Sequence, residues 1–170
     1  MKKRLAIVAG GNSGEFEISI QSGYQVLENV DREYFEPYMV IMRRGEWTCK
    51  LQNGENQPVD KNDFSVALGK RKIQFDVVFI AIHGSPGEDG KLQGYFDLLG
   101  LPYTSCNHVV SAITFDKFYC KKIVGAFGVP TPKAMILRNR NFNIGEIISE
   151  LQLPVLSNPT KGDQVLAFRR

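Results

Sequence analysis

The sequence predicts an α/β fold in which a parallel β-sheet is flanked by helices. Two continuous apolar runs, Leu5–Ala9 and Phe75–Ile82, each end in a glycine-rich turn that is followed by a helical pattern. Short apolar runs suit strands that are buried on both faces, and their alternation with helices is typical of parallel sheets. Such sheets bind ligands at the carboxyl ends of their strands, so these two turns are the first places to seek a site.

The other elements of the first part of the chain follow from periodicity and turn residues. The spacing predicts a helix over 17–30, a strand over 38–42, a small hairpin or loop over 44–53, one or two helical turns over 62–68, a helix over 91–99 and a brief strand over 101–104. The segment over 62–68 carries the weakest signal of these.

The pattern changes after Thr104, where we expect a boundary between an amino-terminal domain, residues 1–104, and a second unit, residues 105–170. The spacing predicts one long helix over 107–128 that Gly128 and Pro130 end, then a strand over 131–137, a helix over 144–151 and the start of a strand over 154–156. The second unit is short for an independent core, so we expect an incomplete domain.

Composition and charge exclude several classes of protein. The net charge of +3, from 21 basic and 18 acidic residues, is too small to indicate binding to nucleic acid or to an anionic membrane. The cysteines, Cys49, Cys106 and Cys120, form no CxxC pair, so we expect reduced thiols and a cytoplasmic location. The apolar run after the basic start is too short for a signal peptide, and no segment approaches the roughly 18 apolar residues of a membrane span.

The first candidate site is the turn Gly10–Glu15, which lies between a buried strand and a helix. Glycines let a backbone approach a ligand closely, and a helix start offers free N–H groups and a partial positive charge. The turn matches neither the GxGxxG pattern nor the P-loop. A tight structural turn with Glu15 as a helix-start carboxylate explains it as well as the alternative, in which Glu15 binds a substrate ammonium.

The second candidate site is the loop His83–Gly94, at the carboxyl end of the strongest strand. It combines glycines with His83, Glu88 and Asp89, a mixture that a purely structural loop seldom contains. A metal site is disfavoured because adjacent carboxylates rarely ligate one ion and because the chain has only 2 histidines. We therefore assign no metal ligand.

With these motifs the chain resembles the amino-terminal half of the D-alanine–D-alanine ligases. The similarity lies in the stretches GGNSGEFEIS, HGSPGEDGKLQGYFDLLGLPYTSC and SAITFDKFYCKKIVGAFGVPTP, and it runs from about Leu5 to Val155. Its most specific part is the HGxxGEDGxxQG pattern, present from His83 to Gly94. The resemblance implies a Rossmann-like, pre-ATP-grasp domain followed by the start of an ATP-grasp domain.

The resemblance also implies roles for four residues. Glu15 matches the carboxylate that binds the ammonium of the first D-alanine, and we expect it to be catalytic. His83 matches a histidine that lines the same pocket, and Glu88 matches a carboxylate that helps to organise the site. Lys117 matches a lysine that contacts a phosphate of ATP, where positive charge stabilises the transferring group. Without the motif around it, Lys117 would be assigned to a solvated helix face.

The end of the chain departs from the family pattern. Where the family continues with a lysine–proline pair and a glycine–serine–serine loop over the phosphates of ATP, this chain reads SNPTKGDQVLAFRR over 157–170. Asn158 takes the place of a phosphate lysine, and an amide lacks its charge. A codon sequence for the family stretch, read in a shifted frame, translates to these residues. We therefore expect 157–170 to be an aberrant tail and the chain to be a truncated ligase.

The expected function is that of the amino-terminal portion of an enzyme that converts ATP and two D-alanines into D-alanyl-D-alanine, ADP and phosphate for peptidoglycan synthesis. ATP and Mg²⁺ are the cofactors that the resemblance implies, but the family's Mg²⁺ ligands are absent from this sequence, so we expect the chain alone to be inactive. A homodimer is implied by the resemblance only. D-alanine–D-lactate or D-serine ligation and a non-catalytic binding or dimerisation module remain alternatives.

Overall fold

The computed structural model describes residues 1–51, 53–137, 143–151, 155–157 and 166–168. The chain divides into two compact units, Met1–Ser111 and Ala112–Arg170. The first unit contains both candidate turns, and the second contains Lys117.

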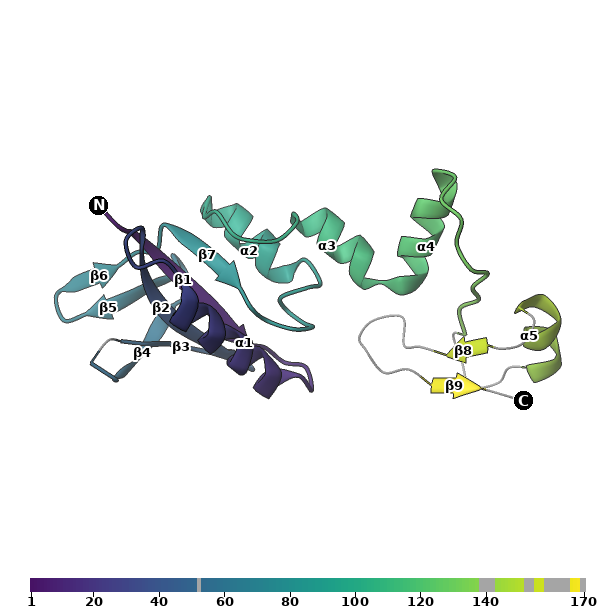
Figure 1. Ribbon diagram of the computed structural model, residues 1–170, viewed down its shortest axis with the longest axis horizontal. Helices are drawn as coiled ribbons and strands as arrows, with labels where there is room; N and C mark the ends of the chain where they lie inside the picture. The colour runs from purple at the N-terminus through teal and green to yellow at the C-terminus, as the bar shows by residue number, and fades with distance from the viewer. Residues whose placement is uncertain (52, 138–142, 152–154, 158–165, 169–170) are drawn as a thin grey trace. The chain divides into compact units, whose positions relative to one another are not determined.

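A seven-stranded sheet forms the centre of the first unit, with its strands in the order β6-β5-β4-β3-β2-β1-β7 (Figure 1). The elements are β1 (Lys3–Gly10), α1 (Phe16–Asn29), β2 (Phe35–Arg43), β3 (Glu46–Lys50), β4 (Asn56–Asp60), β5 (Ser65–Leu68), β6 (Arg71–Ile73), β7 (Val77–Ile80) and α2 (Lys91–Leu99). They confirm the α/β class, the two apolar runs as strands, and the predicted helices over 17–30 and 91–99 to within a residue or two.

The sheet is mixed, and the prediction of a parallel sheet is right only for β2, β1 and β7. β1 lies between β2 and β7 and is parallel to both, whereas β2 to β6 pair as antiparallel neighbours. The turns at Gly45 and Gly69, where φ is +91° and +58°, are far too short for the crossover that a parallel connection needs. The predicted hairpin or loop over 44–53 is thus the first of a series of hairpins.

Two short segments beside the main strands differ in how well the sequence predicted them. The helical turns predicted over 62–68 are wrong, because Ser65–Leu68 is strand β5 and its Val66 is fully buried between two neighbouring strands. The brief strand predicted over 101–104 forms a parallel bridge between Tyr103 and Val78. A four-residue strand shows too little alternation to be separated from a helical turn by its sequence.

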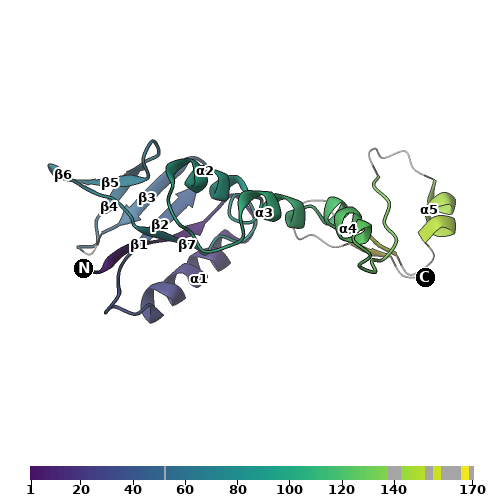
Figure 2. The same ribbon diagram turned by 90° about the horizontal axis from the view of Figure 1, so that it is seen from above.

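The helices α1 and α2 cover opposite faces of the sheet (Figure 2). α1 packs Ile20 and Tyr24 on a cluster that includes the fully buried Ile7 of β1. α2 packs Leu92 and Phe96 on the other face, within a cluster rich in aromatic side chains. Removal of this apolar surface from water stabilises the layers and holds strands β1 and β7 in fixed positions.

The second unit begins within α3 (His108–Phe115) and continues with α4 (Lys117–Ala126), α5 (Ile144–Leu151) and the antiparallel pair β8 (Val155–Ser157) and β9 (Leu166–Phe168). The single helix predicted over 107–128 is wrong, because Asp116 interrupts it. The Asp116 backbone is extended, and its carboxylate accepts hydrogen bonds from the backbone N–H groups of Phe118 and Tyr119. This is the arrangement of a helix N-cap, so a new helix begins there.

The other elements of the second unit agree with the sequence prediction only in part. The helix predicted over 144–151 is confirmed, and the predicted strand over 154–156 corresponds to β8, although Pro154 lies outside the described residues. The strand predicted over 131–137 is wrong, because these residues are irregular. Asn158 and most of the proposed aberrant tail over 157–170 lie outside the described residues.

Candidate functional site

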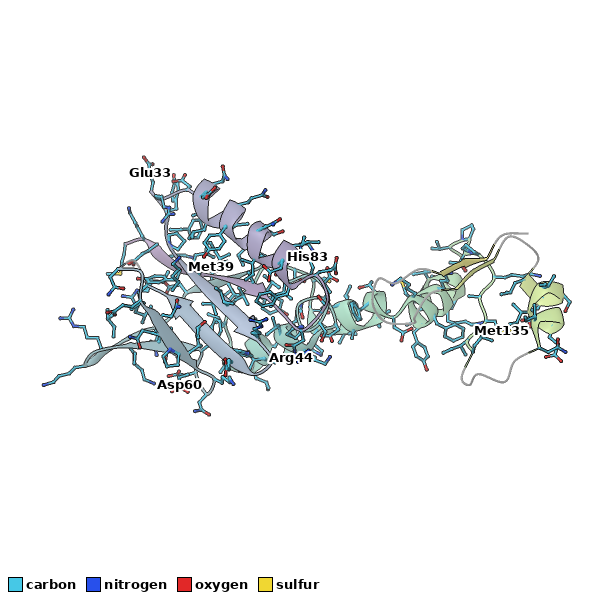
Figure 3. All side chains as sticks on the ribbon, turned by 90° about the horizontal axis from the view of Figure 1, so that it is seen from below. Glu33, Met39, Arg44, Asp60, His83 and Met135 are labelled. Atoms are coloured by element: carbon cyan, nitrogen blue, oxygen red, sulfur yellow. The ribbon has the colours of Figure 1, made fainter. Side chains whose placement is uncertain are left out.

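The carboxyl ends of β1, β2 and β7 meet at one edge of the first unit's sheet, because these strands are parallel. Backbone hydrogen bonds join the turn after β1 to the end of β2 and to the loop that follows β7. Gly11 N donates to Met42 O at 2.8 Å, and Asn12 N donates to Ser85 O at 2.9 Å. Figure 3 shows His83, beside α1, at the same end of the sheet as Arg44, which follows β2. The two candidate turns therefore form one continuous surface.

Two glycines allow the turns to approach this closely. Gly11 has a φ of +99°, and a Cβ on it would lie 2.7 Å from the side chain of Ile82. Gly84 has a φ of +72°, and a Cβ on it would lie 2.9 Å from the Cβ of Ser13. Any larger residue would strain the backbone and push the facing turn away, which explains why the contact is built from glycine.

Glu15 is the residue before α1, and its carboxylate lies against the second turn. Oε2 is 3.9 Å from the position that a Cβ on Gly84 would take, and Gly84 directly follows His83. Ser13 Oγ accepts a hydrogen bond from Glu15 N at 3.2 Å and donates one to His83 O at 2.9 Å. One serine thus ties the two backbones together, so that an acidic and an imidazole side chain belong to one small region.

His83 and Glu88 line a cavity of about 530 Å³ between α1 and the end of β7. The ring of His83 is half-buried, and its Nε2 lies 3.1 Å from Ser22 Oγ of α1. Glu88 is exposed, and the wall contains polar groups such as Ser22 and Ser105 as well as apolar ones. Glu15 does not line this cavity but belongs to the adjoining turn. A cavity of this size accommodates a small molecule.

Asp89 and Lys91 hold the second turn in shape. The Lys91 ammonium contacts the Asp89 carboxylate and donates to Ser85 Oγ at 3.1 Å. Burial acts to raise the pKa of Asp89, but the hydrogen bonds from Lys91 and Ser85 outweigh it and keep this pKa below its usual value. The Asp89 carboxylate is therefore charged at neutral pH and pins the loop on which His83 and Glu88 lie.

Ser19 connects the starts of the two turns through hydrogen bonds, a role that the sequence did not predict. Its side chain is fully buried, and its Oγ accepts a hydrogen bond from Gly10 N at 2.7 Å while donating to Ala81 O at 2.8 Å. It thereby joins the ends of β1 and β7 through α1. Ser19 and Ser22 stand one helical turn apart, and polar residues on the sheet-facing side of an amphipathic helix are the signal that could have found them.

Gln93 supports the same turns from α2, and it too was missed. Its side chain is fully buried, and its Nε2 donates to Gly87 O at 2.6 Å and to Ser105 Oγ at 3.2 Å. Both Gly87 and Ser105 line the cavity. Gln93 therefore holds two residues of the cavity wall in place by hydrogen bonds.

The predicted site residues fall into two groups. Glu15, His83 and Glu88 lie on the joined turns of the first unit. Lys117 belongs to the second unit, where it is the half-buried first residue of α4. Within the part of the chain that the structure describes, no three His, Cys, Asp or Glu side chains are grouped so that they could hold a metal ion.

Comparison with known proteins supports the sequence motifs. The family described as "D-ala D-ala ligase N-terminus" matches residues 4–106. The D-alanine–D-alanine ligase of Phocaeicola vulgatus is 44% identical over 164 residues, which cover 95% of this chain and 50% of that protein. The chain thus spans about half the length of the curated relatives that it matches.

Solved structures share the fold. The VanG D-Ala:D-Ser ligase from Enterococcus faecalis is 30% identical with a TM-score of 0.81, and the match covers 98% of this chain and 55% of that one. The D-alanine–D-alanine ligase from Bacillus anthracis, complexed with ATP, is 26% identical with a TM-score of 0.72, over 98% of this chain and 51% of that one. No helix in the described part of the chain is long and apolar enough to cross a membrane. Because the family match extends over nearly the whole first unit, this chain belongs to the D-Ala–D-Ala ligase amino-terminal family.

Proposed function

We propose that this chain provides the binding site for the first D-alanine of a D-alanine–D-alanine ligase, an enzyme that joins two D-alanines with hydrolysis of ATP to make a peptidoglycan precursor. The observation that carries the proposal is the position of the Glu15 carboxylate against the turn that bears His83. Family membership supplies the class of substrate, and this geometry supplies the groups that a zwitterion needs.

Glu15 and His83 offer complementary partners to the two charged groups of an amino acid. A carboxylate binds an ammonium through a charge-assisted hydrogen bond, which is stronger where water is partly excluded, and Glu15 is half-buried. An imidazole N–H can donate to the carboxylate of the same ligand. Two such contacts on one rigid surface fix the orientation of the bound amino acid. The proposed role of Glu88 is to help organise the site.

The groups that act on ATP are only partly represented. ATP use is supported by family membership and by the Bacillus anthracis complex, and Lys117 is the proposed contact to a phosphate of ATP. The described residues contain no cluster suited to Mg²⁺, so we assign no ligand to that ion. We therefore expect no turnover by this chain alone.

The proposed location is the cytoplasm, and the proposed homodimer rests on the family resemblance.

Titration of the chain with D-alanine, followed by NMR of the backbone amides, tests the site. D-alanine should shift the amides of both turns, and Glu15→Gln should weaken its binding about tenfold or more, since a charge-assisted hydrogen bond is lost. Glu17→Gln is the matched control, because Glu17 is exposed in the first turn of the same helix and changes the net charge equally. Binding that survives Glu15→Gln unchanged, or that shifts amides elsewhere only, would contradict the proposal.

A ligase that joins D-alanine to D-serine is the second candidate, because the VanG neighbour is a D-Ala:D-Ser ligase. Both reactions start from D-alanine, so the titration of the first-site residues is expected to give the same result for either.

Release of phosphate from ATP by the chain with D-alanine and Mg²⁺ tests the expected inactivity, and clear turnover would show that expectation to be wrong.

A further inference from the structure

The helix α1 packs directly against strands β1 and β2 at Gly23. Gly23 makes this possible, since a Cβ on it would lie 2.6 Å from Met39 Cε and 2.7 Å from Ala9 Cβ. Ser19 anchors the preceding turn of the helix to the ends of β1 and β7 by its two buried hydrogen bonds. The residue between these two anchors that reaches the site is Ser22, which is therefore held on a rigid backbone.

Ser22 contacts one nitrogen of the His83 ring, Nε2. Its Oγ lies 3.1 Å from Nε2, and within the described residues no group makes a hydrogen bond to Nδ1. A neutral imidazole carries a single N–H, on one nitrogen or the other. A hydroxyl can donate to a bare Nε2 or accept from a protonated one, so the direction of this hydrogen bond and the tautomer of His83 are one question.

We propose that Ser22 is a positioning residue that donates to His83 Nε2 and thereby holds the ring as the Nδ1–H tautomer. The assignment of the ligand rests on the proposed function. If Glu15 binds the ammonium of an amino acid, the group left for His83 is the carboxylate, which only accepts hydrogen bonds. A bare Nδ1 would repel that carboxylate, whereas an Nδ1–H would bind it.

The tautomer can be observed directly, without any ligand, by long-range nitrogen–proton NMR of chain labelled with nitrogen-15 histidine. The spectra are recorded at about pH 8, above the pKa of about 6.5 that is ordinary for an imidazole. The chain has 2 histidines, and the second is an internal reference because His108 Nδ1 pairs with Asp97 at 2.8 Å. We expect His83 to show the Nδ1–H pattern. The Nε2–H pattern in the unmodified chain would overturn the proposal.

Variants then test whether Ser22 is the cause. Ser22→Ala should convert His83 to a mixture of tautomers, Ser22→Thr should restore the Nδ1–H pattern, and His108 should be unchanged in both. Asp97→Asn is the converse control, which should alter His108 alone. An unchanged His83 pattern in Ser22→Ala would assign the tautomer to some other cause and overturn the role of Ser22. If Ser22→Ala does not fold, Ser22→Cys provides a weaker donor of similar size, which should give an intermediate mixture.

Ligand binding separates this inference from the proposed function. Ser22→Ala should weaken D-alanine about tenfold but leave D-alaninol, which has the ammonium and no carboxylate, within about twofold. Equal losses for both ligands would contradict a role through the carboxylate. If the unmodified chain binds neither ligand, the proposed function fails, while the tautomer measurement still decides the position of the proton on His83.

Discussion

At the scale of single residues, the candidate site depends on polar side chains that bond to backbone groups. Ser13, Ser19 and Gln93 each connect two segments that are distant in sequence, and two of the three are fully buried. A buried backbone group that loses its partner costs about 1–3 kcal/mol, so these contacts hold the turns firmly. They also explain how two glycine-rich turns can hold Glu15 and His83 in fixed positions.

Gln93 allows a sharp test of this view. Its Nε2 donates to Gly87 O at 2.6 Å, and no group in the described part of the chain donates to its Oε1. Gln93→Glu replaces the donor with a carboxylate that faces a carbonyl oxygen, and it should lower the free energy of unfolding by about 3 kcal/mol at neutral pH.

The effect of Gln93→Glu should depend on pH. Burial raises the pKa of the introduced carboxyl above its unfolded value of about 4.3, so the folded state keeps the proton longer and the free energy of unfolding falls as pH rises above that value. Urea denaturation at about pH 4 and pH 7, each relative to the unmodified chain, measures the difference. Gln21→Glu, on an exposed position of α1, should show little change, and equal losses at both pH values would contradict the argument.

At the scale of elements, the most informative correction is the break between α3 and α4. The apolar spacing runs through both helices, so periodicity alone joins them into one. The break depends on the Asp116 carboxylate, which binds two backbone N–H groups that a continuous helix would have paired with carbonyls. An aspartate inside an apolar helical pattern is an ambiguous signal, because the same side chain is tolerated on a solvated helix face.

Removal of this cap should loosen the start of α4. Asp116→Ala should destabilise the first turn by about 1 kcal/mol, which corresponds to about fivefold faster hydrogen exchange of the Phe118 and Tyr119 amides. Asp116→Asn keeps an acceptor oxygen and should retain most of the protection. Exchange rates that do not differ between the alanine variant and the unmodified chain would show that the cap is not what begins this helix.

At the scale of the whole molecule, the three thiols report on how the chain is packed. Cys49 is buried in the main cluster, Cys106 is exposed and Cys120 is half-buried. Burial raises the pKa of the Cys49 thiol to about 12, so its reactive thiolate is scarce near neutral pH. A thiol reagent at about pH 8 should therefore label Cys106 and Cys120 in the folded chain, and should label Cys49 only when the first unit opens.

The same burial makes stability depend on alkaline pH. The unfolded thiol of Cys49 ionises near 9.0 and the folded one near 12, so the free energy of unfolding should fall as pH rises between these values. Cys49→Ser, compared with Cys106→Ser as an exposed control, should remove this part of the pH dependence. Rapid labelling of all three thiols in the folded chain would contradict the packing described for Cys49.

The sequence by itself determined the α/β class, the strands β1 and β7, the helices α1 and α2, and the two glycine-rich turns, because these features are encoded in short contiguous patterns. It also determined family membership, since the motifs around Glu15 and His83 are specific. Only the tertiary structure decided that the sheet is mixed, that β5 is a strand, and that Ser19, Ser22 and Gln93 support the turns. The pairing of these strands and the hydrogen bonds of these side chains depend on partners that are distant along the chain. A local sequence pattern does not specify which backbone group a buried hydroxyl or amide will bind.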